Sequence, residues 1–218
     1  ADRDKFPSGM RFLADKIHHL GLKLGLYLDC GTQTCAGYPG SQGFEHLDAS
    51  TIADWGADFL KYDECHSTHD EEMTRFFKMR DALNQTGRKI LFSIDPIQSR
   101  CNGDPEGSAY MWDGSATASR GGGYVGCHKD KAADDISPVW ESMVCILDAN
   151  IAFDSRRWAG RGRWVEYDML EVGNGMSLEE DRAHFSLWSI MGAPLIAGNN
   201  LKTMSDGTRS ILTNREVI

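Results

Sequence analysis

The chain has 218 residues, of which 41 % are hydrophobic, and it carries a net charge of -9. A chain of this size and composition can bury a full core, and it has no run of the roughly 18 apolar residues that a membrane-spanning helix needs. The acidic excess disfavours nucleic acid and anionic membrane surfaces as partners, because both attract clustered lysine and arginine. A neutral ligand fits this composition better.

Repeated helix–strand units are predicted in the N-terminal part of the chain. Each helix carries apolar residues at helical spacing and ends near a glycine, and a short hydrophobic run follows as a strand. The stripe of the first helix is formed by Met10, Leu13, Ile17 and Leu20. We expect helices at residues 8–20, 48–55 and 70–83, and strands at 22–28, 57–63 and 89–95. This alternation predicts an α/β fold with a parallel sheet.

The second half of the chain shows a weaker pattern. Residues 98–126 are rich in Gly, Ser and Asp, and we predict no element there. A helix is expected at residues 137–148, followed by strands at 164–169 and 194–197. Between these strands, Ser177 and Glu180 have the spacing of a capping box and open another helix. About six strands result, whereas a closed (β/α)8 barrel has eight.

Three consecutive predicted strands end in an acidic residue: Asp29, Asp63 and Asp95. Parallel strands deliver their carboxyl ends to one rim, where α/β enzymes build their active sites. Lys61 lies two residues before Asp63 and therefore on the same face of its strand. A positive charge there would lower the pKa of the Asp63 carboxyl, as a nucleophile requires. A structural ion pair at the strand end explains the same spacing equally well.

The six cysteines do not show the paired spacing of a zinc site, so disulfides are expected instead. Cys101 and Cys127 flank the irregular segment and are candidates for one pair, whereas Cys30 and Cys145 are predicted to be buried free thiols. The triplet at residues 84–86 is an N-glycosylation sequon, which indicates a secreted or lumenal route. The first residues contain no initiator methionine or apolar signal segment, so the chain is interpreted as an internal piece.

Several separate motifs follow one another along the chain: GLKLGLY (21–27), TCAGYPGS (34–41), ADWG (53–56), KYDEC (61–65), DMLEVGNG (168–175) and APLI (193–196). Together they resemble family 27 of the glycoside hydrolases, which comprises α-galactosidases and α-N-acetylgalactosaminidases. Their order and nearly end-to-end coverage make coincidence an inadequate explanation. The resemblance implies a (β/α)8 barrel that acts on carbohydrate without a metal or another cofactor.

The same resemblance assigns roles to two aspartates. The lysine-x-aspartate motif of the family falls on Lys61 and Asp63, which makes Asp63 the nucleophile of a retaining mechanism. Asp135, followed by Ile136 and a tryptophan-bearing helix, matches the acid/base of the family. In a retaining glycosidase the two carboxyl groups should lie about 5–5.5 Å apart.

Other positions match residues around the sugar. Tyr27 corresponds to a tyrosine that lines the sugar subsite, Asp168 and Met169 to residues near its far wall, and Cys35 with Cys65 to a disulfide beside the nucleophile. Core packing would otherwise be the default role of Tyr27 and Met169. Two further substrate-binding candidates depart from the family pattern. Asp95 stands at the position that contacts the 2-position of the sugar in the family. Lys131 stands where the family has an arginine, so a compact ammonium group replaces a guanidinium that can donate two parallel hydrogen bonds.

These observations lead to one reading of the whole chain. Residues 1–218 are expected to form a partial catalytic domain, roughly strands 3 to 8 of an incomplete barrel. The predicted activity is that of a retaining, secreted or lysosomal α-galactosidase, with a homodimer as a candidate assembly. The alternatives are an α-N-acetylgalactosaminidase, which Asp95 disfavours, and a catalytically silent glycan-binding relative. The first two strands of the family, which carry further sugar-binding residues, have no counterpart among the predicted strands. The chain alone is therefore expected to be inactive.

Overall fold

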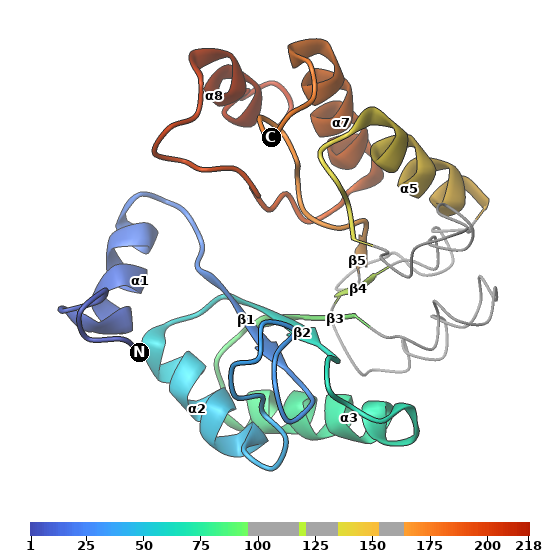
Figure 1. Ribbon diagram of the computed structural model, residues 1–218. Coiled ribbons are helices and arrows are strands. Elements are labelled where there is room, and N and C mark those ends of the chain that lie inside the picture. Colours follow the sequence, from blue (N-terminus) through green and yellow to red (C-terminus); the bar gives the residue numbers. More distant parts are fainter. Residues whose placement is uncertain (96–117, 121–134, 153–163) are drawn as a thin grey trace. The chain divides into compact units, whose positions relative to one another are not determined.

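The computed structural model describes residues 1–95, 118–120, 135–152 and 164–218 (Figure 1). Lys131, predicted to bind substrate, and Cys101 and Cys127, predicted as a candidate pair, lie outside these residues. The chain divides into two compact units, one built on residues 1–97 with 111–119 and the other on residues 98–110 with 120–218.

The first unit confirms the predicted alternation of helices and parallel strands. Strand β1 pairs with β2, β2 with β3 and β3 with the short strand β4, all in parallel. Strand β4 lies in the stretch for which no element was predicted. The elements are α1 (Gly9–His19), β1 (Gly25–Asp29), α2 (Glu45–Trp55), β2 (Phe59–Asp63), α3 (His69–Gln85), β3 (Leu91–Ile94) and β4 (Ala118–Arg120).

The side chains of β2 alternate between the core and the opposite face of the sheet. Leu60 and Tyr62 are fully buried, and the Tyr62 ring contacts the rings of Phe76 on α3 and Phe92 on β3. Helices α2 and α3 pack side by side against this face (Figure 1). Since neighbouring residues of a strand point to opposite faces, Lys61 and Asp63 are directed away from this core.

The strand register brings the predicted acids to one edge. Asp29 at the end of β1 is paired with Asp63 at the end of β2, and Tyr27 is paired with Lys61. Asp95 directly follows β3, and its N–H donates to the Tyr62 carbonyl. The prediction that three strand ends place their acids on one rim is therefore confirmed.

Helix α1 buries a different set of residues from the predicted one. Met10 and Ala14 are its buried residues, whereas Leu20, expected to end the apolar stripe, is 73 % exposed. Leu20 is the C-cap, one position beyond the last helical residue. Among the described residues, none of the helices is both long and apolar enough to cross a membrane.

The second unit contains α5 (Trp140–Ala152), β5 (Trp164–Glu166), α7 (Leu178–Met191) and α8 (Asp206–Leu212). The predicted capping box is present: the Ser177 side chain accepts from the Glu180 N–H, and the Glu180 side chain accepts from the Ser177 N–H. Gly192 ends α7 in a left-handed conformation. Helix α8 was not predicted.

Two predicted strands of this unit differ in the structure. Residues 194–197 form only an isolated bridge between Ala197 and Leu170, because the Ile196 N–H turns back to the Pro194 carbonyl and the backbone does not stay extended. Strand β5 is shorter than predicted, and Asp168, shortly after its end, has a φ of 74°. A residue in the left-handed region cannot continue a strand.

Candidate active site

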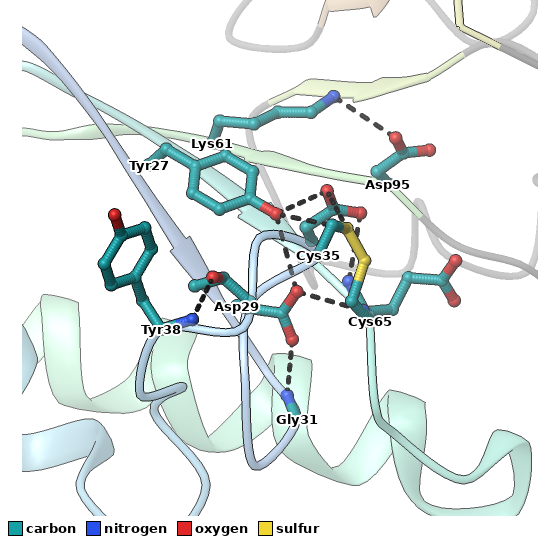
Figure 2. Close-up of a disulfide and its surroundings, with 11 residues drawn as sticks. Tyr27, Asp29, Gly31, Cys35, Tyr38, Lys61, Cys65 and Asp95 are labelled. Atoms are coloured by element: carbon teal, nitrogen blue, oxygen red, sulfur yellow. Dashed lines mark hydrogen bonds and ion pairs between the residues drawn. A yellow bond between two sulfur atoms is a disulfide. The ribbon is translucent and has the colours of Figure 1, made fainter.

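The ends of β1 and β2 gather a tyrosine, two carboxylates and a disulfide at one place (Figure 2). The Tyr27 hydroxyl donates to Oδ2 of Asp63 at 2.7 Å and lies 3.5 Å from Oδ2 of Asp29. Oδ1 of Asp63 accepts from the N–H of Glu64 at 3.0 Å. Both oxygens of the half-buried Asp63 carboxylate are thus oriented by hydrogen bonds, which fixes the plane of this candidate nucleophile.

Tyr27 is 44 % exposed, so one part of its ring remains accessible while its hydroxyl contacts the carboxylates. Partial burial, the hydrogen bond to Asp63 and the charges of Asp63 and Asp29 all raise the pKa of the Tyr27 hydroxyl. The hydroxyl therefore stays protonated at neutral pH and remains a donor to Asp63. A cavity of about 430 Å³ opens beside it, with Cys35 and Tyr38 among its lining residues.

Asp29 is fully buried behind this pair. Its Oδ1 accepts from the Gly31 N–H at 2.7 Å and its Oδ2 from the Cys65 N–H at 2.9 Å. Burial is the main cause that raises the pKa of the Asp29 carboxyl to about 6; the charge of Asp63 adds to this, and the two backbone N–H donors oppose it. The sequence placed Asp29 with the other strand-end acids on one rim but assigned it no individual role.

The predicted disulfide between Cys35 and Cys65 is present, with 5.1 Å between the two Cα atoms. Its Cys35 sulfur lies 3.5 Å from Oδ2 of Asp63. The side-chain oxygen and sulfur atoms of Asp29, Cys35, Asp63 and Cys65 all lie within 4.8 Å of one another, a spacing that could suit a metal. The disulfide occupies both sulfurs, so this set does not offer the thiolates that a soft metal prefers.

The two cysteines predicted as free thiols have different fates. Cys30 is a fully buried thiol that is not in a disulfide, which confirms the prediction. Cys145 is disulfide-bonded, so the prediction of a free thiol is wrong at that position. An apolar environment in the sequence is compatible with either state, because a disulfide is as easily buried as a thiol.

Lys61 reaches towards Asp95 rather than standing alone beside Asp63 (Figure 2). Its ammonium nitrogen lies 3.7 Å from Oδ2 of Asp95, and the two side chains are 15 % and 3 % exposed. Lys61 can contact Asp95 because Asp95 directly follows β3, the strand that pairs with β2. The local sequence around Lys61 does not reveal that β3 is the neighbouring strand. The pair presents one cation and one carboxylate on the face of the sheet that carries Asp63.

In the second unit, Asp168 anchors the backbone next to Asp135. Its Oδ2 accepts from the Ile136 N–H at 2.8 Å, its Oδ1 accepts from the Met169 N–H at 2.7 Å, and its carbonyl accepts from the buried Trp188 indole at 2.9 Å. Asp135 is exposed, whereas Ile136 and Asp168 are buried. Met169 is 38 % exposed. The left-handed φ of Asp168 is a strained conformation of the kind that clusters at functional sites.

The structure thus brings together five of the predicted site residues in the first unit, namely Tyr27, Cys35, Lys61, Asp63 and Cys65, with Asp95 paired to Lys61. Asp135, Asp168 and Met169 belong to the second unit. The separation of about 5–5.5 Å between Asp63 and Asp135 stays a prediction.

A family model described as alpha galactosidase A matches residues 1–218. Alpha-galactosidase A of Cellvibrio japonicus is 45 % identical over 230 residues, and the match covers 100 % of this chain and 52 % of the relative. Alpha-galactosidase A of Homo sapiens is 39 % identical over 226 residues, with coverages of 100 % and 49 %.

Among solved structures, that of an alpha-galactosidase from Saccharomyces cerevisiae with raffinose is similar to this chain with a TM-score of 0.75 and 31 % identity. This similarity covers 97 % of this chain and 49 % of the yeast protein. The chain therefore spans about half the length of the relatives it matches.

Proposed function

The chain belongs to the alpha-galactosidase A family, and from this premise we propose that it forms part of the catalytic domain of a retaining α-galactosidase. The enzyme would hydrolyse terminal α-D-galactosyl residues of oligosaccharides or glycoconjugates. One observation carries the proposal: the Asp63 carboxylate stands at the carboxyl end of β2 and accepts a hydrogen bond of 2.7 Å from Tyr27. The family match and the relatives named alpha-galactosidase support the same activity.

In the first chemical step, an oxygen of Asp63 attacks the anomeric carbon of the galactosyl residue. The bond from this carbon to the glycosidic oxygen breaks, and the leaving oxygen takes the proton of the Asp135 carboxyl group. A covalent galactosyl ester of Asp63 results. The hydrogen bonds from Tyr27 and Glu64 support this role, because they hold the attacking carboxylate in one plane.

In the second step, Asp135 is a carboxylate and takes a proton from water. The water oxygen attacks the anomeric carbon, and the bond to Asp63 breaks. Two inversions give α-galactose, so the configuration is retained. The anchoring of the neighbouring Ile136 N–H by Asp168 supports a fixed position for Asp135 within its own unit.

The sugar would be recognised by polar groups around these carboxylates. We assign Lys61 and Asp95 to the sugar hydroxyls, because their charges lie on the same sheet face as Asp63 and a mixed cation–carboxylate pair offers both donors and acceptors. Tyr27, Lys131, Asp168 and Met169 complete the proposed subsite. A buried acid at position 95 is a poor neighbour for an acetamido group, which supports galactose over N-acetylgalactosamine.

The proposed architecture is an incomplete (β/α)8 barrel, of which this chain supplies roughly strands 3 to 8. The parallel strands of the first unit and the helices between them support it. A secreted or lysosomal location is proposed as well, which the disulfide supports because such bonds persist in oxidising compartments.

The test is covalent labelling in the full-length protein. A mechanism-based galactose analogue should attach to Asp63, and Asp63→Asn should abolish labelling and lower the rate by several orders of magnitude, as expected for removal of a nucleophile. Asp58→Asn is the matched control, since Asp58 directly precedes β2 at its opposite end. Proton NMR should identify α-galactose as the first product. Binding of galactosides without turnover would instead indicate the silent glycan-binding relative, and a label on another carboxylate would overturn the assignment.

A further inference from the structure

We infer that Asp29 is a positioning residue for the nucleophile: its carboxylate fixes the backbone beyond Asp63 and thereby holds the Asp63 carboxylate in its attacking orientation. The inference rests on the proposed role of Asp63. It concerns a residue that does not touch the sugar but acts through the chain segment that follows the nucleophile.

The contacts of Asp29 join two segments that meet at Asp63. Its Oδ2 accepts from the N–H of Cys65, two residues after Asp63, and its Oδ1 accepts from the N–H of Gly31 in the loop that leads to Cys35. The Cys30 N–H also donates to the Asp63 carbonyl at 2.8 Å. The backbone on both sides of the disulfide is thus tied to one buried carboxylate.

The second link runs through side chains. Oδ2 of Asp29 lies 3.5 Å from the Tyr27 hydroxyl, which donates to Asp63 at 2.7 Å. The Tyr27 hydroxyl carries one proton, and the shorter distance assigns it to Asp63. Figure 2 shows the contact between Tyr27 and Asp29, and a shift of Asp29 would therefore move the hydroxyl that donates to Asp63.

The electrostatics argue that this arrangement serves more than folding. A fully buried carboxylate has been placed within 4.8 Å of a second carboxylate, and burial together with the charge of Asp63 disfavours ionisation of Asp29. A neutral side chain would avoid this repulsion. Only a carboxylate, however, offers an acceptor oxygen to each of the two backbone N–H groups, because the amide of an asparagine would place an NH2 group against one of them.

The experiment compares Asp29→Asn with wild type and with Asp58→Asn in the full-length protein. Asp58 is a matched control, because its carboxylate likewise accepts a backbone N–H, that of Leu24 at 2.9 Å, but next to the opposite end of β2. Asp29→Asn should lower kcat by about 10- to 100-fold, the loss that a misplacement of about 1 Å causes. KM for an aryl α-galactoside should change by less than about threefold, because ground-state contacts remain.

The rate of covalent labelling of Asp63 should fall in the same proportion as kcat. Asp58→Asn should lose thermal stability while kcat per folded molecule stays within about twofold of wild type. Asp29→Glu keeps the charge but displaces the carboxylate, and it should also lower kcat. Circular dichroism and mapping of the Cys35–Cys65 bond verify that the variants compared are folded.

Each result has a defined meaning. If folded Asp29→Asn is labelled and turns over at the wild-type rate, Asp29 serves stability only and the inference is wrong. The same conclusion follows if Asp29→Asn and Asp58→Asn lose stability equally and neither variant loses kcat. If the wild-type protein is not labelled at Asp63 at all, the proposed function fails instead, and this outcome is separable from the other two.

Discussion

The buried carboxyl of Asp29 should make the stability of the protein depend on pH in a way that Asp29→Asn removes. Burial and the neighbouring charge of Asp63 raise the pKa of Asp29 to about 6 in the folded state, against an ordinary value near 4. Between these values the folded state binds a proton that the unfolded state has released. Stability must then fall as the pH rises through this window.

The magnitude follows from the size of the pKa change. One unit corresponds to about 1.4 kcal/mol, so a rise of about two units costs the folded state roughly 3 kcal/mol once Asp29 is ionised. The cost is absent below about pH 4 and complete above about pH 6 or 7. The Asn variant lacks the titration but also mispairs one backbone N–H, a loss that is independent of pH. The change of the stability difference with pH, rather than its absolute size, is therefore diagnostic.

The measurement is guanidinium-induced unfolding of wild type and Asp29→Asn at several pH values from 4 to 7. The free energy of unfolding of the variant should gain about 3 kcal/mol relative to wild type across this range. The titratable groups that face Asp29 are Asp63 on β2 and Tyr27 on β1, and Tyr27 stays protonated throughout because its pKa is raised. A stability difference that is constant with pH, or that changes in the opposite direction, would refute the reasoning.

Four further outcomes are expected. Asp135→Ala should slow substrates with poor leaving groups far more than activated aryl galactosides, and equal losses would contradict the acid/base role. Cys35→Ser should lower the free energy of unfolding by about 3–4 kcal/mol, since the bond joins residues 30 apart; alkylation of Cys35 in folded wild type would contradict the bond. Ser177→Ala should cost about 1 kcal/mol in thermal unfolding, and no change would show that the cap is unimportant. The 218-residue chain alone should not hydrolyse an aryl α-galactoside at a rate comparable to the full-length protein.

The parts of the fold that the sequence predicted are those governed by local pattern. Hydrophobic runs flanked by glycines located β1, β2 and β3 within a few residues, and their shared ends placed Asp29, Asp63 and Asp95 on one edge. The capping box of α7 was equally local and equally correct. The disulfide was not derivable from spacing, and only the family resemblance indicated it.

The parts that could not be predicted depend on contacts between distant segments. Lys61 and Asp63 share a face by strand geometry, but the partner of Lys61 is set by the neighbouring strand that delivers Asp95. The left-handed φ of Asp168, which is not a glycine, has no local sequence signal. The bonded state of Cys145 likewise requires knowledge of a distant partner.

A common device orients each of the two proposed catalytic acids within its own unit. In the first, Asp29 accepts from the N–H of Cys65, shortly after Asp63; in the second, Asp168 accepts from the N–H of Ile136, directly after Asp135. A backbone donor can rotate less than a side chain, so a buried carboxylate that holds it limits the motion of the adjacent acid. The proposed catalytic acids can then remain partly exposed, while the residues that hold the adjacent backbone are buried. This division explains why the strand-end pattern suggested Asp63 and the family resemblance suggested Asp135, whereas neither gave an individual role to Asp29.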